Sequence, residues 1–198
     1  MTISTYLNKW HQVPAAVKQF LLRGLLLLVA WKVIYLGFLL PGRVIDAPLT
    51  RDVGIITTYG LNWITHSHDY HFKYELGREE DVDLNAVSVM QESVYYHDKK
   101  IVGVYDGCNA LELFVLYAGF IICVPAALKK KLLFITGGVV LIFLVNILRC
   151  IGIAYLIQYY PQHADFAHHY VFVFVVYGLI IAMWLAFAGN IKVKTNAK

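Results

Sequence analysis

The chain has 198 residues, of which 59% are apolar and only 15% charged, and its mean hydropathy is +0.60. Soluble domains are more polar than this, so the composition indicates an integral membrane protein with the lipid bilayer as its surroundings. The net charge of +4 is small. There is no basic stripe of the kind that binds nucleic acid, which excludes that class of partner.

Four segments are long and apolar enough to cross a bilayer, which takes about 20 residues of helix. They are residues 20–40, 109–128, 132–157 and 170–189. The first is too long for a cleaved signal peptide and is not followed by a small-x-small cleavage site. We therefore expect an all-α integral membrane protein with about four transmembrane helices, forming a single membrane domain over residues 1–198.

Lysine and arginine predict the orientation, because cytoplasmic segments are enriched in both residues. Lys9, Lys18 and Arg23 lie at the start of the first span, residues 129–131 read KKK, and the last residues read KVKTNAK. With four spans these three regions share one side of the membrane. We expect a plasma (inner) membrane protein with both termini in the cytoplasm and an extracytoplasmic loop at 41–107.

Smaller elements are expected outside the spans. Apolar residues spaced three and four apart predict two interfacial helices. Their stripes are Ile3, Tyr6, Leu7, Trp10 and Val13 before Pro14, and Val53, Ile56, Gly60, Trp63 and Ile64 in the large loop. Residues 93–107, SVYYHDKKIVGVYDG, alternate apolar and polar around a polar HDKK, which predicts a small extracytoplasmic β-hairpin leading to Cys108.

Few charged residues lie within the predicted spans: Lys32, Glu112 and Arg149, with Asn146 one turn before the arginine. Each such group costs several kcal/mol in a bilayer and is a functional candidate. Arg149 lies about 25 Å along the third span, in the outer third of the membrane core. It could instead snorkel to the surface or hold a backbone carbonyl. Glu112 either pairs with Lys32, which we favour, or orients Arg149.

The polar residues near the outer surface form one constellation. Cys108 opens the second span, and His168 and His169 open the fourth, at a depth similar to that of Arg149. A nearby cation or a helix N-terminus favours the reactive thiolate form of a cysteine. A histidine can then transfer the proton, and an arginine can hold a developing oxyanion. The sequence has neither an H-E-x-x-H nor a G-x-S-x-G motif. The cysteine, histidine and arginine are therefore the complete set of catalytic groups that it offers.

The other two cysteines have less specific positions. Cys123 lies about 22 Å from Cys108 along one helix, too far for a disulfide, and is interpreted as a core residue. Cys150 points about 100° away from Arg149 and is expected to pack elsewhere. A disulfide between Cys108 and Cys150 remains an alternative.

The loop sequence HSHDYH contains His66, His68 and His71 around Asp69. This spacing would suit zinc or copper, but a solvated polar loop is the preferred interpretation. We expect no bound metal and no cofactor. His163, in PQHADF, is interpreted as a surface turn residue.

Three motifs carry a family resemblance. DGCNA at 106–110, NILR at 146–149 and FAHH at 166–169 each lie at the outer end of a predicted helix. This pattern, over roughly residues 104–185, resembles the exosortase and archaeosortase family, of which a four-span chain would be a short member. By this resemblance, Cys108 takes the position of the family's nucleophile, Arg149 that of its motif arginine and His168 that of its motif histidine. The supporting positions are then Asn109, Glu112, Asn146 and His169.

The resemblance implies a membrane cysteine protease or transpeptidase. Its partner would be a membrane-anchored protein with a C-terminal sorting signal, made of a short motif, a transmembrane helix and a basic tail. The enzyme would cut near that helix and transfer the protein to an acceptor. The alternative is a non-catalytic assembly protein in which Lys32, Glu112 and Arg149 only hold helices together. A small transporter is less well supported, because the spans offer few polar residues for a pathway.

Overall fold

The computed structural model describes residues 14–80 and 86–189. Its elements are α2 (Ala15–Ile34) with a π-helical end (Tyr35–Leu39), α3 (Asp46–Thr65), β1 (Tyr70–Glu80), β2 (Ala86–Tyr96), β3 (Lys99–Val104), a 3₁₀ turn (Asp106–Cys108), α4 (Leu111–Cys123), α5 (Leu128–Tyr159), α6 (Pro161–Phe166), a π turn (Ala167–Val171) and α7 (Phe172–Gly189). The helix expected before Pro14 lies outside the described residues.

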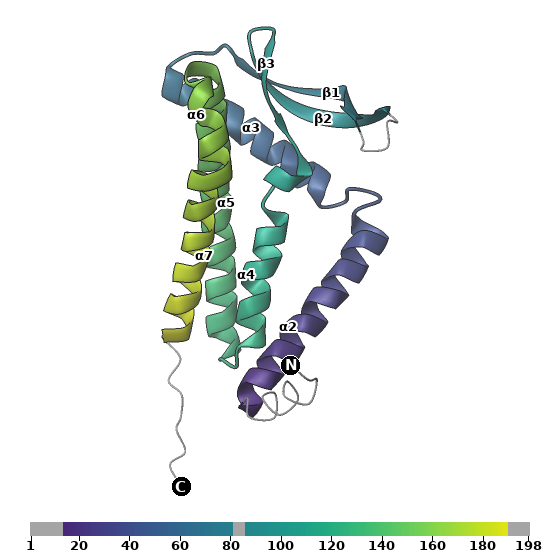
Figure 1. Ribbon diagram of the computed structural model, residues 1–198, viewed down its shortest axis with the longest axis vertical. Coiled ribbons are helices and arrows are strands. Elements are labelled where there is room, and N and C mark those ends of the chain that lie inside the picture. Colours follow the sequence, from purple (N-terminus) through teal and green to yellow (C-terminus); the bar gives the residue numbers. More distant parts are fainter. Residues whose placement is uncertain (1–13, 81–85, 190–198) are drawn as a thin grey trace, which may run out of the picture.

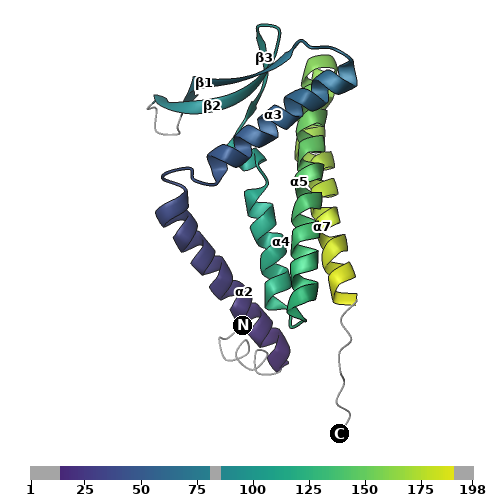
Figure 2. The same cartoon turned by 180° about the vertical axis from the view of Figure 1, so that it is seen from behind.

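The long helices run lengthwise, and α3 and the sheet lie at one end of them, which we call the sheet end (Figure 1). The view from behind shows that α2 diverges from α4 as it approaches this end (Figure 2). The first turn of α2 and the last turn of α7 both lie at the opposite end (Figures 1 and 2). The chain thus passes four times between the two ends of the molecule.

Three helical stretches are long and apolar enough to span a membrane: Val17–Leu39, Leu128–Tyr159 and Pro161–Gly189. The expected span at 109–128 is instead the short helix α4, of 13 residues. Such a helix extends about 20 Å, less than the roughly 30 Å hydrocarbon core. It ends because Val124 precedes Pro125 and adopts an extended conformation. A count of four full spans is therefore not confirmed.

The connection before the last span is tighter than expected. Tyr160 alone interrupts the helix, with φ −141° and ψ 58°, and Pro161 starts α6 in the position that suits proline. From there α6, the π turn and α7 continue as one helical stretch to Gly189. The span expected at 170–189 is therefore preceded by helix back to Pro161. His163, interpreted from the sequence as a surface turn residue, is exposed but lies in α6 and not in a turn.

The interfacial helix predicted in the large loop is present as α3, but its buried face differs from the predicted stripe. The buried residues are Asp46, Thr50, Val53, Gly54, Thr57, Thr58 and Leu61. Of the predicted stripe, Val53 is fully buried whereas Trp63 is 79% exposed. Polar groups face the protein here, and an apolar surface faces outward. An exposed apolar surface of this kind is typical of a helix lying at a membrane interface.

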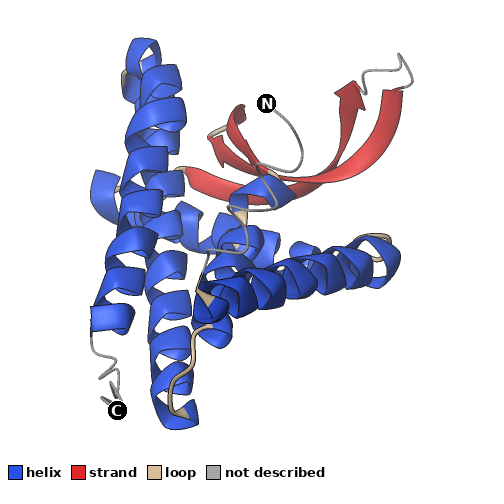
Figure 3. Cartoon of the chain, turned by 60° about the horizontal axis from the view of Figure 1, so that its bottom comes forward, coloured by secondary structure: helices blue, strands red, loops and turns tan. Residues whose placement is uncertain are grey.

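The predicted hairpin is confirmed as β2 and β3, joined by a turn at His97 and Asp98. A third strand, β1, pairs antiparallel with β2 from Tyr70↔Tyr96 onward, so the order is β1-β2-β3 with β3 at an edge. The histidines of HSHDYH are exposed, as expected of a solvated stretch, but the loop ends at Asp69 because β1 begins at Tyr70. Figure 3 shows the curved sheet with one end against the helices and the other extending beyond them.

Close packing of α4 on α5 depends on a glycine. Tyr117 of α4 is 1% exposed, and its hydroxyl donates a hydrogen bond to the Phe134 carbonyl at 2.9 Å. A Cβ atom built on Gly138 of α5 would overlap the Tyr117 ring, whereas one on the neighbouring Gly137 meets nothing within 4 Å. A small residue at position 138 is therefore required for this contact.

We expect Gly138→Ala to destabilise the protein by about 1–3 kcal/mol, because the added methyl group overpacks the helix contact. Gly137→Ala is the matched control and should be neutral or slightly stabilising, since alanine favours helix. Thermal unfolding in detergent, followed by size-exclusion chromatography, measures both variants. Equal melting temperatures for the two would contradict this account of the contact.

Candidate active site

Cys108 ends the 3₁₀ turn that follows β3, and α4 begins three residues later. Its amide donates a hydrogen bond to the Tyr105 carbonyl at 2.7 Å. Its carbonyl accepts one from Asn146 Nδ2, also at 2.7 Å. The side chain is half-buried beside the apolar cluster formed by α3, the sheet and α5. The cysteine is thus held by its backbone, with its thiol at the edge of the core.

Arg149 reaches the thiol from α5. Its Nη2 lies 3.7 Å from Cys108 Sγ, and its Nη1 donates to Asn146 Oδ1 at 3.3 Å. The fully buried Asn146 therefore orients the arginine with its oxygen and holds the cysteine backbone with its nitrogen. This geometry places Arg149 at the thiol and not in a snorkelling position at the surface.

The two histidines lie in different surroundings. His168 is half-buried and lines the same cavity as Cys108, and within the described residues its Nδ1 is buried without a hydrogen-bond partner. His169 is largely exposed and contacts Asp165 Oδ1 at 3.1 Å. The geometry thus favours His168 as the imidazole that faces the thiol.

The remaining cysteines are free thiols, as is Cys108. Cys123 is buried, in line with a core residue. Cys150 is also buried, but it lines the same cavity as Cys108. The expectation that it packs elsewhere is wrong, because the cysteine loop folds back over this turn of α5.

The loop histidines do not come together. His66 ends α3 in a left-handed conformation, and His68 and His71 lie before and at the start of β1, all exposed. Among residues 14–80 and 86–189, no group of three or more His, Cys, Asp or Glu side chains could hold a metal ion. The histidine spacing therefore reflects an exposed turn into the sheet.

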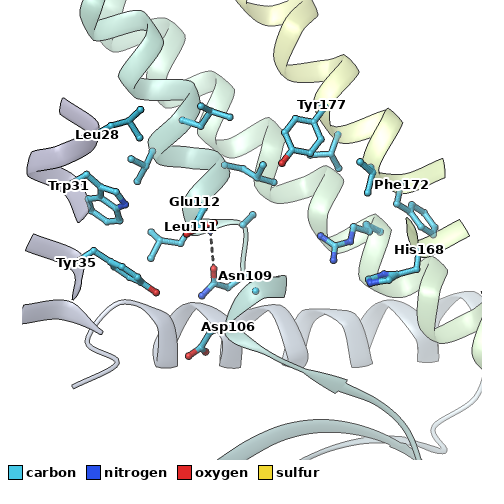
Figure 4. A pocket seen from close by; sticks show the side chains of 18 of the residues that line it. Leu28, Trp31, Tyr35, Asp106, Asn109, Leu111, Glu112, His168, Phe172 and Tyr177 are labelled. Atoms are coloured by element: carbon cyan, nitrogen blue, oxygen red, sulfur yellow. Dashed lines mark hydrogen bonds between the residues drawn. The ribbon is translucent and has the colours of Figure 1, made fainter. Parts of the chain in front are cut away.

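Two cavities meet at the polar constellation. The first, which we call the helix-side groove, has a volume of about 660 Å³ and lies between α2, α4 and α7. Figure 4 shows Trp31 and Tyr35 on one wall and His168 and Phe172 on the other. The second, the sheet-side cavity, has a volume of about 530 Å³ and lies between β3, α5 and α6. His168 lines both, Arg149 lines the groove and Cys108 the cavity.

A salt bridge crosses the helix-side groove. Lys32 Nζ of α2 lies 3.0 Å from Glu112 Oε1 of α4. Both residues line the groove together with Arg149. The pair ties α2 to the short helix that follows the cysteine, which matches the pairing favoured from the sequence.

A second set of contacts, which the sequence analysis missed, holds the cysteine loop from the side of α3. Asp46 Oδ1 accepts a hydrogen bond from Asn109 Nδ2 at 2.8 Å, and Asp46 Oδ2 accepts one from the Tyr35 hydroxyl at 3.1 Å. Asn109 Oδ1 accepts the Leu111 amide at 2.9 Å, at the first turn of α4. Asp46 and Asn109 are each 1% exposed. The residue after the nucleophile candidate is therefore locked to α3.

An ion pair completes this anchoring network. Arg43 binds both carboxylate oxygens of Asp106, at 2.6 and 2.9 Å, and Thr50 donates to the same carboxylate at 2.8 Å. Burial of this carboxyl opposes its ionisation, but the hydrogen bonds from Arg43 and Thr50 and the Arg43 charge outweigh burial and keep the pKa of Asp106 below its usual range. The contribution of the pair to stability is then present above pH about 3.9 and falls as the pH drops through the lowered value.

The sequence held one signal for this network. Asp46, Thr50 and Thr57 recur at helical spacing, so they share one face of α3. A polar face is ordinarily assigned to solvent, and only the tertiary structure turns it toward the protein.

We expect Asn109→Asp to destabilise the cysteine loop by about 3–5 kcal/mol, because it places an unpaired carboxylate against buried Asp46. Adding Asp46→Asn should restore much of the loss, since the new amide can donate to the new carboxylate. Thermal unfolding and the rate of Cys108 alkylation, read by peptide mass spectrometry, measure both effects. If the double variant is no better than the single one, the pairing does not hold the loop.

Comparison with known proteins identifies the family of the chain. A family model for transmembrane exosortases matches residues 10–187, which include all the motif residues. No curated protein and no solved structure matches the chain. Because the model covers nearly the whole chain, from α2 through α7, the protein belongs to the transmembrane exosortase family.

Proposed function

We propose that this exosortase is a membrane cysteine protease or transpeptidase that cleaves C-terminal sorting signals at the outer membrane–water interface. The observation that carries the proposal is the 3.7 Å contact between Arg149 Nη2 and Cys108 Sγ. A guanidinium next to the attacking sulfur is placed to hold the oxyanion that forms when the sulfur adds to a carbonyl. His168 lines the same cavity as that thiol and has a free ring nitrogen among the described contacts.

The reaction would proceed by acyl transfer. The Cys108 thiolate attacks the scissile carbonyl carbon, forming an S–C bond and a tetrahedral oxyanion next to Arg149. Collapse of this intermediate breaks the C–N bond, and His168 in its protonated form gives its proton to the leaving amine. The thioester on Cys108 then passes to an amine acceptor or to water, which regenerates the thiol.

The substrate helix would lie in the helix-side groove. This groove runs between α2, α4 and α7 and has apolar walls, including Leu28 and Val176. Helix α2 forms one wall of this groove, with Leu28 and Trp31. A helix lying there brings its outer end to Arg149 and His168, which line the same groove.

The proposed orientation has the sheet outside and both termini in the cytoplasm. Three consecutive lysines open α5 about 28 Å from Arg149 along the helix. Lys130 and Lys131 donate to the carbonyls of Phe187 and Ile122 near the ends of α7 and α4. Positive charge thus gathers at the end opposite the sheet, as expected for a cytoplasmic face.

We expect Cys108→Ala to abolish processing of a co-expressed membrane protein that ends in a motif, an apolar helix and a basic tail. The Cys108 sulfur is the nucleophile that attacks the scissile bond in the proposed reaction, so no slow residual cleavage is expected. Immunoblotting for the shift between precursor and product measures it, and Cys123→Ala is the control because that thiol is buried away from the cavity.

The outcome against the proposal is continued processing in a Cys108→Ala protein that is folded and inserted. This result would favour the non-catalytic assembly role. The specific observation behind that alternative is the Lys32–Glu112 bridge between α2 and α4.

The two histidines should differ in their effect. His168→Ala removes the imidazole that lines both cavities, so processing should fall by about 10²–10⁴-fold, the usual contribution of a proton-transfer group. His169→Ala should change it little, because that ring faces Asp165 at the surface. Initial rates of product formation compare the two variants. A larger loss in His169→Ala would reverse the assignment.

A further inference from the structure

The sheet-side cavity has a position and a lining that the proposed reaction has not yet used. Its walls are apolar side chains from three elements: Ile101, Val102 and Val104 of β3, Ile153 and Ile157 of α5, and Ala164 of α6. Among its lining residues the carboxylate is Asp165, whose side chain is 87% exposed. Away from His168 and this exposed carboxylate, the walls formed by β3, α5 and α6 therefore offer no partner for a charged side chain.

The reacting atoms lie where this cavity meets the helix-side groove. Cys108 lines the cavity, Arg149 lines the groove, and His168 lines both. A peptide bond attacked by Cys108 and protonated by His168 must then lie at this junction, with one side of the substrate in each space.

The direction of the substrate follows from its membrane helix. That helix lies on the carboxyl side of the scissile bond and requires the groove, because the groove runs along α2, α4 and α7. The segment on the amino side of the scissile bond, which becomes the thioester, then lies in the sheet-side cavity. The sheet-side cavity is bounded by β3 and by the ends of α5 and α6 next to the sheet.

We propose that the sheet-side cavity is the specificity pocket for the acyl side of the substrate, and that it accepts an apolar side chain next to the scissile carbonyl. This inference rests on the proposed function, since it assigns the two sides of a cleaved bond. A volume of about 530 Å³ falls in the range of ligand pockets, about 300–1,000 Å³. It suits a short extended segment.

Strand β3 supports an extended substrate in this position. It is an edge strand that pairs with β2 on one side. Among the described residues, no backbone hydrogen bond from outside the sheet is made by Ile101, Val102 or Val104. Three of its side chains line the cavity, and the strand leads to Cys108 within a few residues. A substrate strand added at this edge would place alternate side chains toward the cavity.

Peptide aldehydes test the pocket without a known substrate, because they carry only acyl-side residues. The Cys108 sulfur adds to the aldehyde carbon, the thiol proton moves to the oxygen, and a reversible thiohemiacetal results. Purified full-length protein in lipid nanodiscs is incubated with acetyl-Ala-Ala-leucinal or acetyl-Ala-Ala-aspartal and then alkylated with iodoacetamide. Mass spectrometry of the Cys108 peptide measures protection separately from Cys123 and Cys150.

We expect leucinal to protect Cys108 at a concentration about tenfold or more below that of aspartal, as burial of a leucine side chain implies. Ala164→Phe fills the cavity from α6 and should remove this preference. Gln162→Phe is the matched control, because it adds the same side chain at an exposed position of α6 outside the cavity. It should keep the preference of the wild type.

Equal protection by the two aldehydes, no protection by either, or an unchanged preference in Ala164→Phe would each overturn the pocket. These results are distinct from failure of the proposed function, which is measured by processing in Cys108→Ala. If Cys108→Ala loses processing while leucinal and aspartal protect Cys108 equally, the proposed protease function is supported and the proposed specificity pocket is wrong. If leucinal is preferred but processing continues without Cys108, the cavity binds apolar groups without serving this reaction.

Discussion

The amide of Asn146 is the contact on which the site depends. A backbone carbonyl in a tightly packed, water-poor region needs a hydrogen-bond donor, and Asn146 Nδ2 supplies one to Cys108 at 2.7 Å. The oxygen of the same side chain is then directed at Arg149. One fully buried residue thus couples the place of the thiol to the direction of the guanidinium. Because the amide has both a donor and an acceptor, a leucine at this position would fill the space but align neither group.

The cysteine loop is held from two sides. From α5 it receives Asn146 and Arg149, and from α3 it receives Asp46 and Thr50, which reach Asn109 and Asp106. Without such contacts, a short loop between a strand and a helix is usually more mobile than the elements that it connects. Contacts on both flanks of Cys108 fix the backbone of the loop, while Cys108 itself lines the sheet-side cavity. This arrangement suits a nucleophile that must be accessible and yet fixed in position.

The short length of α4 has a structural consequence. A full span starting at residue 109 would have placed Cys108 at the end of a long helix, as the sequence suggested. Instead Ala110 is left-handed, with φ 67°, and α4 begins after it. This turn lets the strand β3 and the helix α4 meet at an angle around the cysteine.

The groove beside α4 is bridged by Lys32 and Glu112, whose mutual attraction offsets part of the cost of placing two charges among apolar walls.

Much of the architecture was predictable from the sequence, because helices in a membrane are selected by length and hydropathy. Three of the four predicted spans, the interfacial helix α3 and the β2–β3 hairpin are present, and DGCNA, NILR and FAHH meet at one site. Hydropathy did not predict the end of α4, since Val124 to Leu128 are as apolar as the helix before them and only Pro125 interrupts it. The strand β1 was also missed: HSHDYH was interpreted as a loop through His71, whereas β1 begins at Tyr70.

The sequence by itself determined which residue types the membrane helices carry and in what order the thiol, guanidinium and imidazole arrive. The tertiary structure alone decided that His168 and Cys150 line the same cavity as Cys108, and that the polar face of α3 points inward to Asp106 and Asn109. These are relations between residues more than thirty positions apart or between neighbours on one helix turn. Periodicity along a chain gives the direction of a side chain relative to its own helix axis, but which partner occupies that direction depends on how the helices pack.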